Sequence, residues 1–256
     1  MASRREFARL LAGAPFALEA FGARPARAQA ASTGSPKGAL KIAARSKLVM
    51  IGDSITDAGR ARSGADAGGG PLGRGYVSMV DTLLAAVYPD QPIWIVNTGI
   101  SGNTVRDLKA RWTADVLDLK PDWLSVMIGT NDVWRQFDSP RQPDKAVPLD
   151  EYEQTLGELL ARTKPTLKGL VLLTPFYLEP NRLEPMRAQM DRYGAAVRRL
   201  AAAHGALFVD TQAAFDEVLA AAYTANFARD RVHPNDAGAM VLARAFVNAI
   251  GFSWVR

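Results

Sequence analysis

Hydrophobic residues fall into short runs that alternate along the chain with longer segments of mixed polarity. The short runs are brief enough to be buried strands and span Leu48–Ile51, Ile93–Val96, Trp123–Ile128, Leu170–Leu173 and Leu207–Val209. The longer segments repeat apolar residues at helical spacing and include Tyr76–Val87, Val105–Leu117, Leu149–Thr163, Met186–Ala203 and Asp236–Ile250. Strands that are apolar on both faces and alternate with helices predict a parallel sheet covered on both sides. We therefore expect a flavodoxin-like, three-layer α/β/α sandwich around a five-stranded parallel sheet.

The pattern predicts one folded domain over residues 47–256. The chain has 256 residues, 48% of them hydrophobic, which is enough for one large core. Residues 29–46 are rich in Ser, Gly, Lys and Pro and are expected to form a linker. A glycine-dense patch, Gly64–Gly75, is expected to be a loop that either flanks a site or only connects elements. No apolar run reaches the roughly 20 residues needed to cross a bilayer, so membrane insertion is not expected.

Residues 1–28 have the layout of a twin-arginine signal peptide. Arg4 and Arg5 precede a modestly apolar stretch, and Ala26-Arg27-Ala28 offers a cleavage site. This layout predicts export in the folded state, to the periplasm or beyond. The alternatives are an uncleaved tail and an amphipathic helix.

Charge and rare residues exclude several classes of partner and cofactor. The leader carries five basic and two acidic residues, so without it the formal charge falls from +5 to +2. The remainder has no basic stripe with interleaved aromatic residues, so nucleic acid is not an expected partner. Cysteine is absent and His204 and His233 are the only histidines, which excludes disulfides, a thiolate nucleophile and a cysteine- or histidine-rich zinc site. A carboxylate site for magnesium or calcium is left open, without EF-hand spacing.

Polar clusters follow the predicted strands, and ligands gather at the carboxyl ends of strands in folds of this kind. The clusters are residues 52–56, 97–104, 129–132 and 230–234. A serine hydroxyl becomes a strong nucleophile when a histidine held by a carboxylate takes its proton. His233 follows Asp230 by three residues, and we interpret Ser54, His233 and Asp230 as a catalytic triad. The alternative is a capping loop with a solvated histidine.

The second histidine has a structural explanation. His204 ends an alanine-rich helical segment and precedes Gly205, whose residue type favours a C-cap. A cation at that end interacts favourably with the helix dipole. His233 is therefore the histidine left to activate the serine.

An ester hydrolase must also stabilise the negatively charged oxygen that forms when serine attacks. The candidate donors are the backbone N–H groups of Ser54 and Gly102 and the side-chain amide of Asn131. Alternatively, Gly102 only makes a turn and Asn131 only caps the next segment. Two acids beside these residues, Asp53 and Asp132, are expected to be structural and to brace the loops.

Four segments, GDSIT, ISGNT, GTND and DRVHP, resemble in order and position the four blocks of the SGNH or GDSL hydrolase superfamily. The resemblance implies a flavodoxin-like fold and no metal or organic cofactor. It also implies functional roles for Ser54, Gly102, Asn131 and His233, with Asp230 completing the triad.

Longer stretches are similar to the acetylxylan esterases of this superfamily. They are GDSITDAGRAR, GISGNTVRDLKARW, GTNDVWRQFDSP, LLTPFYLEPN, LFVDTQAAF and AIGFSWVR. The similarity implies an O-acetylated xylo-oligosaccharide as substrate, acetate and a free sugar hydroxyl as products, and assembly into a homo-oligomer.

The chain departs from those esterases at two points. They lack an export leader, and several have an aromatic residue where this chain has Arg229, directly before Asp230. Arg229 is thereby a candidate for the rim of the acyl or sugar pocket. Trp134 and Tyr177 follow strand ends and are candidates for stacking on sugar rings, although large aromatic residues at such spacing fill a core as often.

Other interpretations stay open. A thioesterase or lysophospholipase shares all four blocks and needs a long apolar acyl groove. From another class, a non-catalytic carbohydrate-binding protein or a phosphate binder would use the helix N-terminus after GDSIT. Neither of these explains Asp230 and His233 at their spacing, and the chain has no GxxxxGK[ST] phosphate loop.

Overall fold

The computed structural model describes residues 40–62, 70–139 and 141–254. Its centre is a five-stranded parallel sheet with strand order β2-β1-β3-β4-β5. The strands are β1 (Lys47–Gly52), β2 (Trp94–Asn97), β3 (Trp123–Met127), β4 (Gly169–Leu173) and β5 (Leu207–Val209). The predicted flavodoxin-like sheet is confirmed. The expected leader, residues 29–39 of the expected linker and residues 64–69 of the glycine-dense patch lie outside the described residues.

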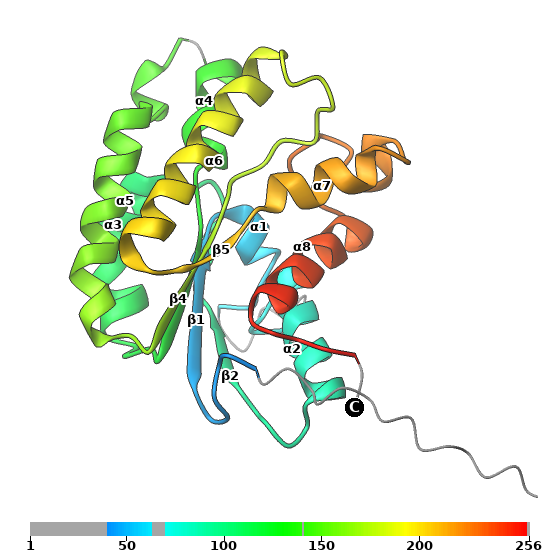
Figure 1. The fold of residues 1–256 in the computed structure, drawn as a ribbon. Helices are drawn as coiled ribbons and strands as arrows, with labels where there is room; N and C mark the ends of the chain where they lie inside the picture. Colours follow the sequence, from blue (N-terminus) through cyan, green and yellow to red (C-terminus); the bar gives the residue numbers. More distant parts are fainter. Residues whose placement is uncertain (1–39, 63–69, 140, 255–256) are drawn as a thin grey trace, which may run out of the picture. The chain divides into compact units, whose positions relative to one another are not determined.

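Helices cover both faces of the sheet (Figure 1). The α-helices are α1 (Ser54–Asp57), α2 (Tyr76–Val87), α3 (Val105–Trp112), α4 (Thr130–Asp138), α5 (Leu149–Thr163), α6 (Pro185–His204), α7 (Thr211–Leu219) and α8 (Asp236–Ala249). The short helices are η1 (Thr113–Leu117), η2 (Pro143–Lys145), η3 (Lys164–Thr166) and η4 (Thr224–Asn226). Helices α2, α7 and α8 pack together on one face, and α3, α4, α5 and α6 on the other.

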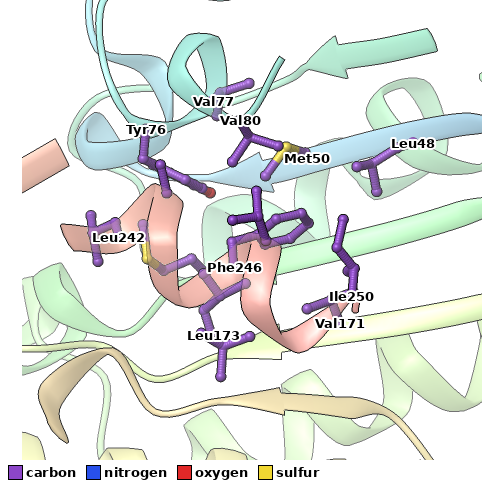
Figure 2. Packing of buried hydrophobic residues seen from close by; sticks show 14 of the residues in the cluster. Leu48, Met50, Tyr76, Val77, Val80, Val171, Leu173, Leu242, Phe246 and Ile250 are labelled. Carbon is purple, nitrogen blue, oxygen red and sulfur yellow. The ribbon is translucent and has the colours of Figure 1, made fainter. Parts of the chain in front are cut away.

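Successive residues of each strand point to opposite faces of the sheet, so the core is divided into two apolar clusters. Leu48 and Met50 of β1 belong to the cluster under α2 and α8, where Phe246 also lies (Figure 2). Val49 and Ile51 belong to the cluster on the opposite face. Because both faces of each strand are buried, the strands are apolar without alternation in their sequence, which is the pattern of a parallel sheet.

The observed helices agree with the segments predicted from periodicity except in three places. The segment expected as one helix over Val105–Leu117 changes at Thr113 from an α-helix to the π-helical turn η1. Helices α4 and α7 were not among the predicted segments, because each has nine residues and too few turns to display a helical period. His204 ends α6 and Gly205 caps it in the left-handed conformation, as expected.

The folded domain begins earlier than the linker prediction allows. Leu40 and Ile42 are buried in the α2–α8 cluster, although both fall within the expected linker 29–46. The Lys41 N–H donates a hydrogen bond of 2.8 Å to the carbonyl of Ile250, beyond the end of α8. The error arose because two apolar residues in a Ser- and Gly-rich stretch carry no periodic signal, and their partner segment is the distant C-terminus.

Candidate active site

Ser54 lies directly after β1, where the chain turns into the short helix α1. The Asp53 carboxylate caps this helix by accepting the Ile55 N–H at 3.0 Å. Ser54 is half-buried, and its own N–H has no acceptor among the residues that the structure describes. The serine thus presents both its hydroxyl and its backbone N–H at the carboxyl edge of the sheet.

A hydrogen-bonded relay joins Ser54 to the loop before α8. Ser54 Oγ lies 2.9 Å from His233 Nε2, and His233 Nδ1 lies 2.6 Å from Asp230 Oδ2. The other Asp230 oxygen accepts the backbone N–H groups of Val232 and His233 at 3.0 and 2.8 Å. A neutral His233 that donates from Nδ1 to the carboxylate has its Nε2 lone pair free for the serine proton.

The loop holds Asp230 in its charged form. Partial burial works to raise the pKa of Asp230, but the hydrogen bonds from His233 and from two backbone N–H groups outweigh it. The net effect lowers the pKa below its ordinary value. Asp230 is therefore a carboxylate across the neutral range, able to orient His233 and to stabilise its cation.

Gly102 supplies a second free N–H at the same edge. Its φ of +83° is a left-handed conformation that favours glycine, and a Cβ there would meet nothing within 4 Å. The N–H of Gly102 has no acceptor within the described ranges. Its loop is fixed against α1, because Ser101 donates through both N–H and Oγ to Asp57 Oδ2 at 3.1 and 3.0 Å.

Asn131, in the first turn of α4, has a fixed amide. Its Oδ1 accepts from Arg135 at 3.0 Å, and its Nδ2 donates to the Asn103 carbonyl at 3.0 Å. An amide nitrogen carries two hydrogens, so one N–H of Asn131 is left for a ligand. Asn103 and Arg135 were not singled out in the sequence, although Asn103 lies inside the ISGNT block.

Two buried acids lie behind the loops, as expected of bracing residues. Asp132 accepts the Val105 N–H at 3.0 Å and so supports the first turn of α3. Burial raises the pKa of Asp53 to about 6 and that of Asp132 to about 7, although backbone hydrogen bonds oppose the shift. Asp132 Oδ2 has no hydrogen-bond partner among the described residues, which disfavours the charged form further.

A cavity of about 250 Å³ opens beside Ser54 and His233. Its other lining residues are Ile55, Ala58, Arg74, Gly75, Tyr76, Pro234, Ala239 and Leu242. Most of these side chains are small or apolar, so the cavity suits a compact group attached to the reacting carbonyl.

The three candidate substrate-contacting residues lie in different surroundings. The ring of Trp134 is half-buried, with its centroid 5.8 Å from that of His233. Tyr177 packs partly against the core on the α3–α6 side and is also half-buried. Arg229 is exposed, one residue before Asp230.

The described ranges hold no group of three or more His, Asp or Glu side chains placed to bind a metal ion. None of their helices is long and apolar enough to span a membrane.

The pattern for the GDSL-like lipase/acylhydrolase family matches residues 50–241, most of the folded domain. The chain belongs to this family. An acetylxylan esterase of Geobacillus stearothermophilus is 59% identical over 217 residues, which are 85% of this chain and 99% of that protein. Family membership and this identity establish the protein as a carboxylic ester hydrolase.

Solved structures agree with this assignment. The crystal structure of the Geobacillus acetylxylan esterase Axe2 matches with a TM-score of 0.81 and 58% identity, over 85% of this chain and 99% of that one. An α/β hydrolase enzyme named LAE5, from the metagenome of Lake Arreo in Spain, matches with a TM-score of 0.79 and 54% identity, over 83% and 98% of the two chains.

Proposed function

We propose that this protein is a serine esterase that removes O-acetyl groups from xylan or xylo-oligosaccharides through an acetyl-Ser54 intermediate. The observation that carries the proposal is the unbroken relay from Ser54 Oγ through His233 to Asp230. The substrate class follows from the high identity to an acetylxylan esterase over nearly its whole length.

The geometry supports a two-step acyl transfer. Ser54 Oγ attacks the acetyl carbonyl while His233 Nε2 takes the hydroxyl proton, and Asp230 stabilises the resulting imidazolium. The C–O bond to the sugar then breaks, and His233 returns the proton to the departing sugar oxygen. In the second step His233 takes a proton from a water molecule, which attacks the acetyl carbonyl. The bond between that carbon and Ser54 Oγ breaks, His233 returns the proton to Oγ, and acetic acid leaves and ionises to acetate.

Three N–H groups are available for the oxyanion of both steps. They are the backbone N–H groups of Ser54 and Gly102 and the free N–H of Asn131. Such donors act mainly on the transition state, because the carbonyl oxygen gains charge only as the nucleophile attacks.

The spacing of the triad along the sequence gives further support. Axe2 has been solved as catalytic mutants in which a serine, an aspartate or a histidine is replaced by alanine. The three replaced positions in Axe2 are separated by the same numbers of residues as Ser54, Asp230 and His233 in this chain.

The cavity favours a short acyl group over a long one. Sites for drug-sized ligands usually have about 300 to 1,000 Å³. The cavity at Ser54, with about 250 Å³, lies below that range. This is the observation that separates the proposal from a thioesterase or lysophospholipase with a long acyl groove.

Acetate release from acetylated xylo-oligosaccharides tests the proposal, with other acetylated glycans for comparison and Ser54→Ala as the matched control. We expect the wild type to release acetate and Ser54→Ala to lose about 10⁴-fold or more in kcat. In parallel, p-nitrophenyl acetate should be cleaved faster than p-nitrophenyl octanoate. Faster cleavage of the octanoate, or an unimpaired Ser54→Ala variant, would contradict the proposal.

We propose that Trp134 contacts the sugar, because its partly exposed ring lies beside His233, the residue that protonates the departing sugar oxygen. Tyr177 and Arg229 are proposed as outer contacts. Trp134→Ala should raise KM for the oligosaccharide by about 2- to 10-fold, the range of a single aromatic contact, whereas Trp134→Phe should keep most of the affinity. An unchanged KM in Trp134→Ala would exclude the contact.

We also propose export through the twin-arginine leader. The support is the order Arg4-Arg5, apolar stretch and Ala-Arg-Ala in residues 1–28. The full chain should be recovered from the periplasm with a mature N-terminus after Ala28, as read from its mass. Replacing Arg4 and Arg5 by Lys should retain it, uncleaved, inside the cell.

Finally, we propose a homo-oligomer. Trp94 and Trp254 are 64% and 66% exposed, and a second copy of the chain packed against them would remove their apolar surface from water. Light scattering coupled to size-exclusion chromatography tests this: a mass near 27.6 kDa or below would mean a monomer.

A further inference from the structure

Arg111, in the last turn of α3, makes an unusual set of hydrogen bonds beneath the site. Its side chain is 14% exposed. Nε donates to Asn103 Oδ1 at 2.6 Å, and one terminal nitrogen donates to the Thr98 carbonyl at 2.6 Å. The other terminal nitrogen donates to the Gly52 carbonyl at 2.9 Å. One planar group thus joins the ends of β1 and β2 and the loop that follows β2.

Each of these acceptors belongs to a segment that carries a proposed oxyanion donor. Gly52 lies two residues before Ser54, and Asn103 directly follows Gly102. The carbonyl of Asn103 in turn accepts the Asn131 side-chain amide. A single guanidinium is therefore connected, through at most two intervening residues, to all three donors.

The charge of Arg111 is compensated on the side away from the site. Asp115 in the π-helical turn η1 accepts from the same terminal nitrogen that binds Thr98, at 2.5 Å. This pairing lets a largely buried cation remain beneath the loops without drawing on the triad carboxylate. A lysine could not replace the fork, because an ammonium is a single point of donation and cannot span three separated acceptors.

We propose that Arg111 is a positioning residue for the oxyanion hole: it holds the Gly102 loop, and through Asn103 the Asn131 amide, in register with Ser54. This inference rests on the proposed esterase function. Arg111 touches no reacting atom, so its contribution is to kcat, through donors that act in the transition state, and not to binding of the ground-state ester.

The test compares Arg111→Ala and Arg111→Lys with Lys109→Ala, an exposed residue of the same helix whose side chain pairs with Glu158. The substrate is p-nitrophenyl acetate, and the concentration of working sites is counted by the acetylation burst. We expect both Arg111 variants to lose about 10- to 100-fold in kcat per site, less than the loss of a donor itself, with KM within about twofold. Lys109→Ala should match the wild type.

Two further readouts separate positioning from general stability. Added guanidinium at millimolar concentration should restore part of the activity of Arg111→Ala and none to Arg111→Lys. Inhibition by methylboronic acid, which forms a tetrahedral adduct on serine, should weaken in both variants by about the factor lost in kcat/KM.

The outcomes are distinct. Full kcat per site in a folded Arg111 variant would overturn the inference, as would a rise in KM alone. If neither Arg111 variant folds, Arg111 serves folding and the inference is also overturned. An inactive wild type, or a Ser54→Ala variant as active as the wild type, would instead refute the esterase function itself.

Discussion

At the scale of single residues, the site depends on groups whose hydrogen bonds are incomplete in the free protein. Within the described part of the chain, the N–H groups of Ser54 and Gly102 have no acceptor, and Asn131 uses one of its two amide hydrogens. These groups are positioned by neighbours that do not react, such as Asp53 for Ser54 and Arg135 for Asn131. Donors held in place before the reaction need no reorganisation when charge develops.

Replacing Asn131 by alanine should lower kcat by about 10² to 10³-fold with little change in KM, because one oxyanion donor is lost only in the transition state. Steady-state kinetics on p-nitrophenyl acetate measure this. Asn248→Ala, an exposed asparagine near the end of α8, is the matched control and should have no effect. A raised KM with normal kcat would show that Asn131 binds the ground state instead.

Asp132 should make the protein less stable as the pH rises. Burial raises its folded-state pKa from 3.8 to about 7, so between those values the folded protein holds a proton that the unfolded chain has released. Its favourable contribution is complete below pH 3.8 and is lost as the pH rises through about 7. The melting temperature of the wild type should therefore fall relative to that of Asp132→Asn on going from about pH 5 to pH 8.

The comparison with Asp132→Asn removes the contributions of titrating groups that do not interact with Asp132. Asp118→Asn, at an exposed position after the π-helical turn, should run parallel to the wild type. A constant gap between wild type and Asp132→Asn across this pH range would show that Asp132 titrates normally.

At the scale of elements, each polar cluster lies where a strand or a loop leads into a helix, and the start of that helix positions its side chains. The four blocks could be located in the sequence because strands, caps and turn residues are encoded within a few neighbouring positions. The π-helical turn and helix α4 could not, because the first differs from an α-helix only in hydrogen-bond register and the second is short. Arg111 was missed for a related reason: nothing near it in the sequence shows that its acceptors lie in two loops that precede it.

Helix α8 begins with an Asn235 cap that also secures the histidine loop. Its side chain accepts the Gly238 N–H at 3.1 Å and donates to the Asn226 carbonyl at 2.9 Å. Asn235→Ala should lower the free energy of unfolding by about 0.5 to 2 kcal/mol, whereas Asn235→Asp should retain the cap. Urea denaturation measures the free energy of unfolding of the two variants. An equal decrease in both would assign the effect to the Asn226 contact.

At the scale of the whole described domain, both ends of the triad rest on one apolar cluster. Strand β1 contributes Leu48 and Met50 to it, and α8 contributes Leu242 and Phe246 (Figure 2). Ser54 lies two residues after the end of that strand, and His233 lies three residues before the start of that helix. Packing of this cluster therefore fixes the distance between nucleophile and base, although the two are 179 residues apart.

The segment before β1 should contribute to the stability of the domain through this cluster. Ile42 is fully buried in the same cluster, so Ile42→Ala should destabilise the protein by about 2 to 5 kcal/mol through lost burial and the cavity left behind. Leu183→Ala removes a similar side chain at a position that is 88% exposed and should have almost no effect. Thermal and urea unfolding of both variants would show whether the domain starts before Lys47, and an unaffected Ile42→Ala would restore the linker prediction.

The sequence by itself determined the class of the fold and the chemical groups of the site. Runs of apolar residues, helical periods and four short polar blocks are local properties, and each can be recognised within about ten residues. The tertiary structure alone decided which N–H groups stay free, how the Asn131 amide is oriented, that Arg111 links the end of β1 to the loop after β2, and that Leu40 and Ile42 belong to the core. Those features depend on contacts between segments far apart in the chain, and no local pattern encodes a partner that only folding brings near.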